Sequence, residues 1–216
     1  MKLVTKLFLF LALPLLLSSC GVHYDTVTFD KVARKTVVPA IEGGDQLKIR
    51  DLTNAIVALG PNVDRNEAGW VAREAVLYPK HLANEYQLMW PPNYHNKLVN
   101  SGKRAKGLCY QWARDMTAHI GVRKYRTLTM DRAVANQGEE YEHNVLTVAA
   151  KGKGTEDAII LDPWRHNSIL YWVKTKDDPE YQWTKYYRRT FIIDKNNKKV
   201  IVPNPDNPAN KAYYNR

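Results

Sequence analysis

One cysteine of this chain stands where cysteines are activated as nucleophiles. Cys109 opens a helical pattern and follows three closely spaced basic residues, and both features favour the thiolate form of a thiol. A thiolate that cleaves amides also needs an imidazole, which activates the thiol and protonates the departing amine. Because the chain's other cysteine, Cys20, is expected to be modified, Cys109 is a thiol without an intrachain partner, either reactive or inert and buried.

His143 is the histidine best placed to serve that thiol. It lies at the start of a strand pattern, residues 142–148, which would hold its imidazole on a rigid element. Asp162 ends the next apolar strand pattern, so antiparallel pairing of the two strands would place both residues at one end of a sheet. The alternatives to a catalytic role are that His143 is a hydrogen-bonded strand residue and that Asp162 begins an Asp-Pro turn after its strand.

Two further sets of residues could contact a ligand. Trp164 follows Asp162 closely and is a candidate for lining a substrate cleft, with core packing as the alternative. His81 and Glu85 lie four residues apart on a possible helix, as metal ligands can. They have no third ligand at matching spacing, so we expect a solvated helix surface there and no metal site.

Three short blocks of this sequence, in order and with their spacing, resemble the transglutaminase-like branch of the papain-like cysteine hydrolases. The blocks are Gly107-Leu108-Cys109-Tyr110-Gln111-Trp112-Ala113, Glu142-His143-Asn144-Val145 and Leu161-Asp162-Pro163. The likeness covers roughly residues 65–165, about half of the chain that follows the signal segment described below. The resemblance implies a papain-like (transglutaminase-core) fold.

The resemblance also implies a role for each residue of the triad. Cys109 would be the nucleophile, His143 the general base and acid, and Asp162 the carboxylate that orients the imidazole. The implied reaction is attack on an amide or peptide carbonyl to give a thioester, which water hydrolyses or an amine intercepts. It implies neither a metal nor a cofactor.

The sequence departs from the papain pattern at the oxyanion donor. Papain-like enzymes carry a glutamine a few residues before the cysteine, whereas Lys103 occupies that region here and Gln87 is far upstream. The backbone N–H of Cys109 supplies one donor, and the second is unassigned.

The first twenty residues are typical of a bacterial lipoprotein signal. Two lysines precede an eleven-residue apolar run, Leu7 to Leu17, which is shorter than the roughly 20 residues of a membrane-spanning helix. Leu17-Ser18-Ser19-Cys20 resembles the lipobox at which lipoprotein signals are cleaved. We therefore expect removal of residues 1–19 and lipid attachment to Cys20 in a bacterial cell envelope, on the periplasmic face of the outer membrane if the cell is Gram-negative; an ordinary secretory signal is the alternative.

Composition indicates one basic domain. Removing residues 1–19 leaves 197 residues with 30 basic and 22 acidic side chains, a net charge of about +8. An exported protein rarely meets nucleic acid, so we expect no nucleic-acid partner. The expected partners are the membrane, through the lipid on Cys20, and a protein or cell-wall peptide substrate, and we expect a monomer.

The hydrophobic pattern predicts an α+β fold, with N-terminal helices packed on a meandering antiparallel sheet. We expect a membrane-proximal tether over residues 20–44 that includes a short strand, a cysteine hydrolase domain over 45–202 and a tail over 203–216. The expected helices cover residues 47–59, 64–77 with Pro79 as a kink or end and a possible extension to 89, and 108–120, with a helix or loop over 94–99. The expected strands cover 125–134, 142–149, 158–161, 169–174, 185–193 and 199–202.

These features support three functions. The leading one is an envelope-anchored thiol hydrolase that acts on amide or peptide bonds through Cys109, His143 and Asp162. Amine transfer at the same site, which would crosslink proteins, is the second. The third is a catalytically silent lipoprotein that binds or scaffolds an envelope partner.

Overall fold

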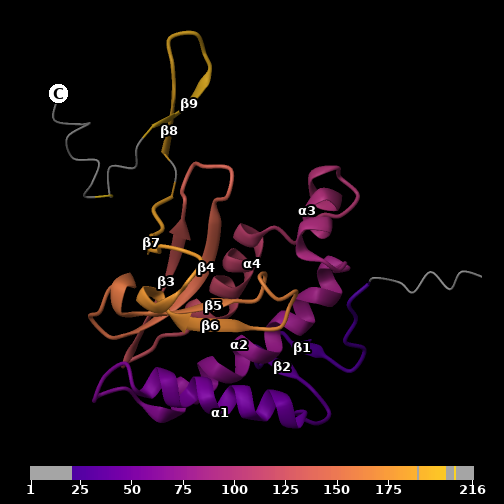
Figure 1. The fold of residues 1–216 in the computed structure, drawn as a ribbon, viewed down its shortest axis with the longest axis vertical. Helices are drawn as coiled ribbons and strands as arrows, with labels where there is room; N and C mark the ends of the chain where they lie inside the picture. Colours follow the sequence, from indigo (N-terminus) through magenta and orange to yellow (C-terminus); the bar gives the residue numbers. More distant parts are fainter. Residues whose placement is uncertain (1–20, 189, 203–206, 208–216) are drawn as a thin grey trace, which may run out of the picture.

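The computed structural model describes residues 21–188, 190–202 and 207 (Figure 1). The expected signal segment, Cys20 and most of the expected tail lie outside the described residues. Within the described part the chain is a mixed α+β structure of four α-helices and a five-stranded antiparallel sheet, as the hydrophobic pattern predicted.

The described chain begins with a hairpin that packs on the helices. Strands β1 (Thr28–Asp30) and β2 (Lys35–Val37) pair antiparallel, where the sequence analysis expected one strand. Thr36 is buried, and both its backbone N–H and its hydroxyl donate to the carboxylate of Glu74. The described part of the expected tether is therefore largely folded against the domain.

Two long helices follow the hairpin, α1 (Gly43–Val57) and α2 (Arg65–Tyr86). The carboxylate of Asp64 caps α2 by accepting the backbone N–H groups of Asn66 and Glu67. Pro79 neither ends nor divides α2, which continues to Tyr86.

The α3 and α4 helices lead to the sheet. Helix α3 (Pro92–Asn100) covers residues 94–99, where a helix or a loop was expected, and α4 (Cys109–Met116) continues into the π-helical turn η1 (Thr117–Gly121). Helix α4 therefore starts at Cys109, the residue predicted from the sequence to be the nucleophile.

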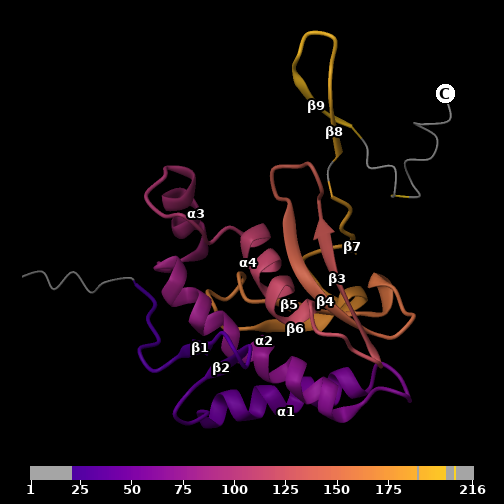
Figure 2. The ribbon, with the colours of Figure 1, turned by 180° about the vertical axis from the view of Figure 1, so that it is seen from behind.

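The sheet has the order β6-β5-β4-β3-β7, so the expected meander is confirmed for β3 to β6. Its strands are β3 (Leu128–Ala135), β4 (His143–Ala150), β5 (Ile159–Asp162), β6 (Tyr171–Lys174) and β7 (Thr184–Lys185), with short 3₁₀ turns η2 (Thr155–Asp157) and η3 (Thr175–Asp177) between them. The single strand expected over residues 185–193 is divided, because β7 pairs with β3 while β8 (Thr190–Ile193) pairs with β9 (Lys199–Val202). The β8–β9 hairpin extends away from the body of the molecule (Figures 1 and 2).

The main core lies between the helices and one face of the sheet. Leu146 of β4 opposes Leu161 of β5, and both pack in one buried cluster with Trp112 and Met116 of α4. The opposite face carries a smaller cluster that includes Val145. This packing fixes α4 across β4, with the start of the helix near the start of the strand (Figure 2).

Candidate active site

Cys109 is the first residue of α4 and is partly exposed as a free thiol. The first backbone N–H groups of a helix lack intrahelical acceptors and carry a partial positive charge that favours an anion. The side-chain oxygen of Gln111 accepts the N–H groups of Gly107 at 2.7 Å and of Leu108 at 2.9 Å, which fixes the entry of the chain into α4. The structure therefore places Cys109 in the helix start that the sequence predicted.

A buried histidine holds the loop in front of Cys109. Nδ1 of His95 accepts the N–H of Met89 at 3.1 Å, and Nε2 donates to the carbonyl of Lys106 at 2.8 Å, so the imidazole is neutral. Burial lowers the pKa of His95, which favours this neutral form. Gly107 packs directly on the ring with φ of +133°, and a Cβ there would lie 2.1 Å from His95 Nε2. Sequence reasoning missed His95, because a histidine that binds two backbone groups has no distinctive spacing.

His143 and Asp162 meet as predicted. The imidazole Nε2 of His143 donates to Oδ2 of Asp162 at 2.7 Å, and the two residues are 2% and 0% exposed. Burial lowers the pKa of His143, but the Asp162 carboxylate and the Cys109 side chain outweigh it and raise that pKa to about 9. The imidazole is therefore cationic at neutral pH.

Cys109 completes the group. Its Sγ–H donates to the carbonyl oxygen of Glu142, the residue before His143, at 3.6 Å, and its side chain is close enough to the imidazole of His143 to raise the pKa of that group. Because Nε2 of His143 is bound to Asp162, Nδ1 is the ring nitrogen left for the thiol. The structure thus brings together all three predicted residues, from one helix start and two neighbouring strands.

An arginine that the sequence analysis did not single out supports Asp162. The backbone N–H groups of Trp164 and Arg165 donate to Oδ1 of Asp162, and Nε of Arg165 donates to Oδ2 at 3.1 Å. These bonds and the charge of His143 hold the pKa of Asp162 below its usual range, although burial acts to raise it. Arg165 also binds Asp178 through two nitrogens, at 3.1 and 2.8 Å, so one guanidinium joins two buried carboxylates.

Three aromatic rings surround the imidazole of His143. The rings of Trp164 and Tyr181 each lie 4.9 Å from it, and that of Trp183 lies 5.5 Å away. Trp164, a candidate for lining a substrate cleft with core packing as the alternative, lies beside the ring of His143, packs against the main core and donates from Nε1 to Asn96 at 3.2 Å. Tyr181 and Trp183 were missed, because the segment that carries them has no regular hydrophobic period. The three rings shield the imidazole from water.

A second arginine missed by sequence reasoning lies near the thiol. The guanidinium of Arg132 stacks on Tyr186 at 4.1 Å, donates to Asn144 at 3.0 Å and is close enough to Cys109 for their charges to interact. Its Nε is buried without a hydrogen bond, and no carboxylate of the described residues forms an ion pair with it. Burial consequently lowers the pKa of Arg132. This positive charge therefore acts on Cys109 without an ion-pair partner among the described residues.

The helix start also offers donors for an oxyanion. The N–H groups of Gln111 and Trp112 bond to the carbonyl of Leu108, whereas those of Cys109 and Tyr110 have no acceptor among the described residues. Tyr110 is therefore the nearest candidate for the second donor that the sequence left unassigned.

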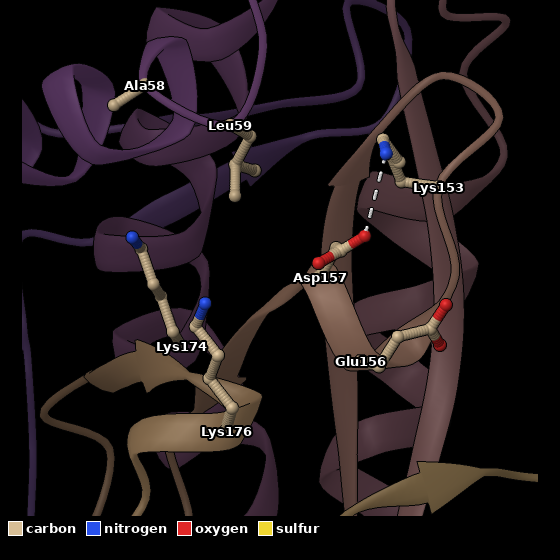
Figure 3. Close-up of a pocket in the computed structure, with 7 residues that line it drawn as sticks. All are labelled: Ala58, Leu59, Lys153, Glu156, Asp157, Lys174 and Lys176. Atoms are coloured by element: carbon tan, nitrogen blue, oxygen red, sulfur yellow. Dashed lines mark ion pairs between the residues drawn. The ribbon is translucent and has the colours of Figure 1, made fainter.

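Other candidate positions lie apart from the triad. His81 Nε2 lies 3.4 Å from Glu85 as an i,i+4 pair, and no group of three or more His, Cys, Asp and Glu side chains in the described part could hold a metal. None of the helices described is long and apolar enough to cross a membrane. A surface hollow of about 170 Å³ has a mixed lining of three lysines, two acids and two apolar residues: Ala58, Leu59, Lys153, Glu156, Asp157, Lys174 and Lys176 (Figure 3). None of the predicted site residues lines it.

Comparison with known proteins gives no assignment. No family model, curated protein or solved structure matches this chain. The arrangement of Cys109, His143 and Asp162 is accordingly the basis for the function proposed below.

Proposed function

We propose that this protein is a thiol hydrolase that cleaves amide or peptide bonds. The observation that carries the proposal is the position of His143, whose imidazole donates to Asp162 and lies close enough to the Cys109 side chain for the two groups to interact. A nucleophile, a base within reach of it and a third group that orients the base form the minimum set for acyl transfer.

The charges of the site favour a thiolate–imidazolium pair. Asp162 stabilises the cationic form of His143 in a site from which three aromatic rings exclude water. The start of α4 and the guanidinium of Arg132 place further positive charge around Cys109.

The reaction then follows in two steps. The thiolate of Cys109 attacks the carbonyl carbon, and the oxyanion that forms is stabilised by the N–H groups of Cys109 and Tyr110. Nδ1–H of His143 protonates the departing amine as the C–N bond breaks, which leaves a thioester on Cys109. Neutral His143 next takes a proton from water, and the hydroxide attacks the thioester to release a carboxylic acid and the thiolate.

The fold supports the same proposal. A cysteine at the start of a helix packed across an antiparallel sheet, with the histidine and aspartate on neighbouring strands, is what the resemblance to the papain-like and transglutaminase-like enzymes implies. We therefore propose the papain-like arrangement for this α+β domain.

The location proposed is the bacterial cell envelope. It rests on the apolar run followed by Ser18-Ser19-Cys20, which supports acylation of Cys20 after removal of residues 1–19. A protein or a cell-wall peptide is the substrate class available in that compartment.

Trapping of the acyl-enzyme tests the proposal. The protein is incubated with a library of peptide esters and amides and examined by mass spectrometry for an acyl group on Cys109, in wild type and in Cys109→Ala and His143→Ala. We expect a thioester in wild type that disappears in both variants and persists in His119→Ala, since His119 belongs to a separate buried pair with Glu74.

The fate of the thioester separates the two enzymatic functions. Release of a carboxylic acid in the presence of a primary amine supports hydrolysis, whereas an amide of the added amine indicates transfer. Failure to acylate Cys109 with any member of the library would favour a silent binding protein.

A further inference from the structure

The described chain starts beside the end of α2 and the beginning of α3. Gly21 forms an isolated antiparallel bridge with Met89, and the N–H of Val22 donates to the carbonyl of Leu88 at 2.8 Å. Gly21 follows Cys20 directly in the sequence, so the residue that we expect to carry the lipid adjoins the part of the chain that bridges to Met89. Both ribbon views place the start of the described chain on the same side of the molecule as α3 (Figures 1 and 2).

Two large aromatic side chains are exposed at that place. Trp90 is 61% exposed and Tyr94 is 45% exposed, and both lie within five residues of Met89. Tryptophan and tyrosine are enriched where proteins meet the headgroup region of a bilayer, because each has an apolar body and a polar tip.

The same region is positively charged. Residues 86–114 contain five basic side chains and no acidic one. Lys106 and Arg114 pair with Asp115, but Lys97, Lys103 and Arg104 form no ion pair with any carboxylate of the described residues. The last acid before this segment, Glu85, pairs with His81 one turn back along α2. The uncompensated charge therefore lies within the segment that carries the aromatic residues.

We propose that this surface, the α3 face formed by Trp90, Tyr94, Lys97, Lys103 and Arg104, lies on an anionic bilayer. The inference rests on acylation of Cys20, proposed above, and is independent of the hydrolase activity. The lipid on Cys20 is attached one residue before Gly21, whose bridge partner Met89 directly precedes Trp90, so it holds the α3 face at the headgroups. There the two rings insert and the basic side chains attract lipid phosphates.

Docking of the α3 face would also fix the distance between the active site and the membrane surface. The side chain of His95 hydrogen-bonds to the backbone of Met89 and to that of Lys106, and Gly107 packs directly on its ring. Cys109 follows two residues later. Docking therefore positions Cys109 at a constant distance from the membrane surface, whatever its substrate.

Fluorescence quenching by brominated lipids tests the proposal. Full-length protein, acylated in cells and purified, is reconstituted into phosphatidylcholine vesicles with or without phosphatidylglycerol, with bromine on the acyl chains. We expect tryptophan quenching in the phosphatidylglycerol vesicles that Trp90→Phe removes. Trp70→Phe is the matched control, because Trp70 lies sixteen residues before Tyr86 on α2, about 24 Å along the helix axis.

Charge variants test the headgroup contribution. Lys97→Gln and Lys103→Gln should each reduce the ratio of docked to undocked protein about fivefold on phosphatidylglycerol vesicles. Lys176→Gln, an exposed lysine beyond β6, should leave the ratio unchanged.

Each outcome has one meaning. Mass spectrometry of the purified protein first establishes whether Cys20 is acylated; if it is not, the proposed anchor is wrong and this proposal is overturned with it. If Cys20 is acylated but quenching is equal in wild type and Trp90→Phe, the anchor stands and docking of the α3 face is overturned. Neither result bears on acylation of Cys109 by substrate.

Discussion

The imidazole of His143 donates to Asp162 at 2.7 Å, and a second imidazole, that of His119, contacts Glu74 at 2.8 Å. Both pairs are buried almost completely. His143 also interacts with the Cys109 side chain, whereas Nδ1 of His119 has no hydrogen-bond partner in the described part of the chain and its ring packs among aromatic residues. Glu74 is engaged by Thr36 and Arg73 as well. The second pair is therefore an internal control for the first.

Asp162→Asn should lower the pKa of His143 well below about 9, because burial is then opposed by the Cys109 side chain without the Asp162 carboxylate. NMR titration of labelled histidine measures this value. Glu74→Gln, at the second buried pair, should leave the pKa of His143 unchanged. An unshifted His143 in Asp162→Asn would show that the carboxylate does not hold the charge on the imidazole. Loss of turnover in Asp162→Asn should reach about 10⁴-fold, as expected for a triad that loses its orienting carboxylate.

The stability difference between wild type and Asp162→Asn should depend on pH. The pKa of His143 is raised by folding, so its contribution is complete below 6.5 and is lost as pH rises through about 9. The pKa of Asp162 is lowered, so its contribution is present above 3.8 and is lost at more acidic pH. The difference should therefore be largest between 3.8 and 6.5, as measured by urea unfolding across pH. A difference that grows toward alkaline pH would contradict the assignment of a cationic His143.

Arg165→Met should lower the free energy of unfolding by about 3 to 5 kcal/mol, because Asp162 and Asp178 would remain buried without their shared cation. Arg165 is only 8% exposed, so water cannot replace the guanidinium. Adding Asp178→Asn to this variant should recover part of the loss. Urea midpoints of the single and double variants measure both effects; equal midpoints in wild type and Arg165→Met would refute the bridging role.

Gly107→Ala should cost at least about 3 kcal/mol, because the new Cβ would lie 2.1 Å from the buried His95 ring and φ is +133°. Gly102→Ala is the matched control, since Gly102 also has positive φ, +75°, but nothing lies within 4 Å of its Cβ. That change should cost about 1 to 2 kcal/mol from backbone strain alone. Comparable losses in thermal unfolding of the two variants would mean that His95 moves aside freely.

Arg132→Met should separate stability from activity. No carboxylate of the described residues neutralises Arg132 and its Nε is unbonded, so a methionine should leave stability unchanged or raise it by about 1 kcal/mol. Alkylation and turnover at Cys109 should fall about tenfold with the loss of a neighbouring positive charge. Arg123→Met removes a cation that stacks on Trp70 and should leave both rates unchanged. A stability loss without a rate effect would make Arg132 a structural residue.

Much of this architecture could be predicted from the sequence, because local patterns determine it. The apolar period of α2, the alternation along β4 and the spacing between Cys109, His143 and Asp162 led to the right elements and to three residues that the structure brings close together. Pro79 does not end α2, which runs on to Tyr86 as the possible extension allowed, because the buried face of the helix continues to pack in the core beyond it.

The residues that support the triad could not be predicted in this way. Arg165, Asp178 and Trp183 act through contacts between separate loops, and their spacing has no period that a helix or strand would impose. The division between β7 and β8 was missed for a related reason. Aromatic and β-branched residues occur on both sides of the division within residues 185–193, and only the two different pairing partners show where one strand ends.

The rate of Cys109 alkylation by iodoacetamide, measured from mildly acidic to alkaline pH, tests the central claim most directly. The acylated protein is suitable, because Cys109 is then its single free thiol. Wild type and His119→Ala should react rapidly through the acidic and neutral range, with a change in rate near pH 9 as His143 loses its proton. His143→Ala should react slowly there and accelerate with pH as a free cysteine does, around 8.5. If wild type and His143→Ala instead give the same profile, that of a free cysteine, Cys109 and His143 do not form a catalytic pair.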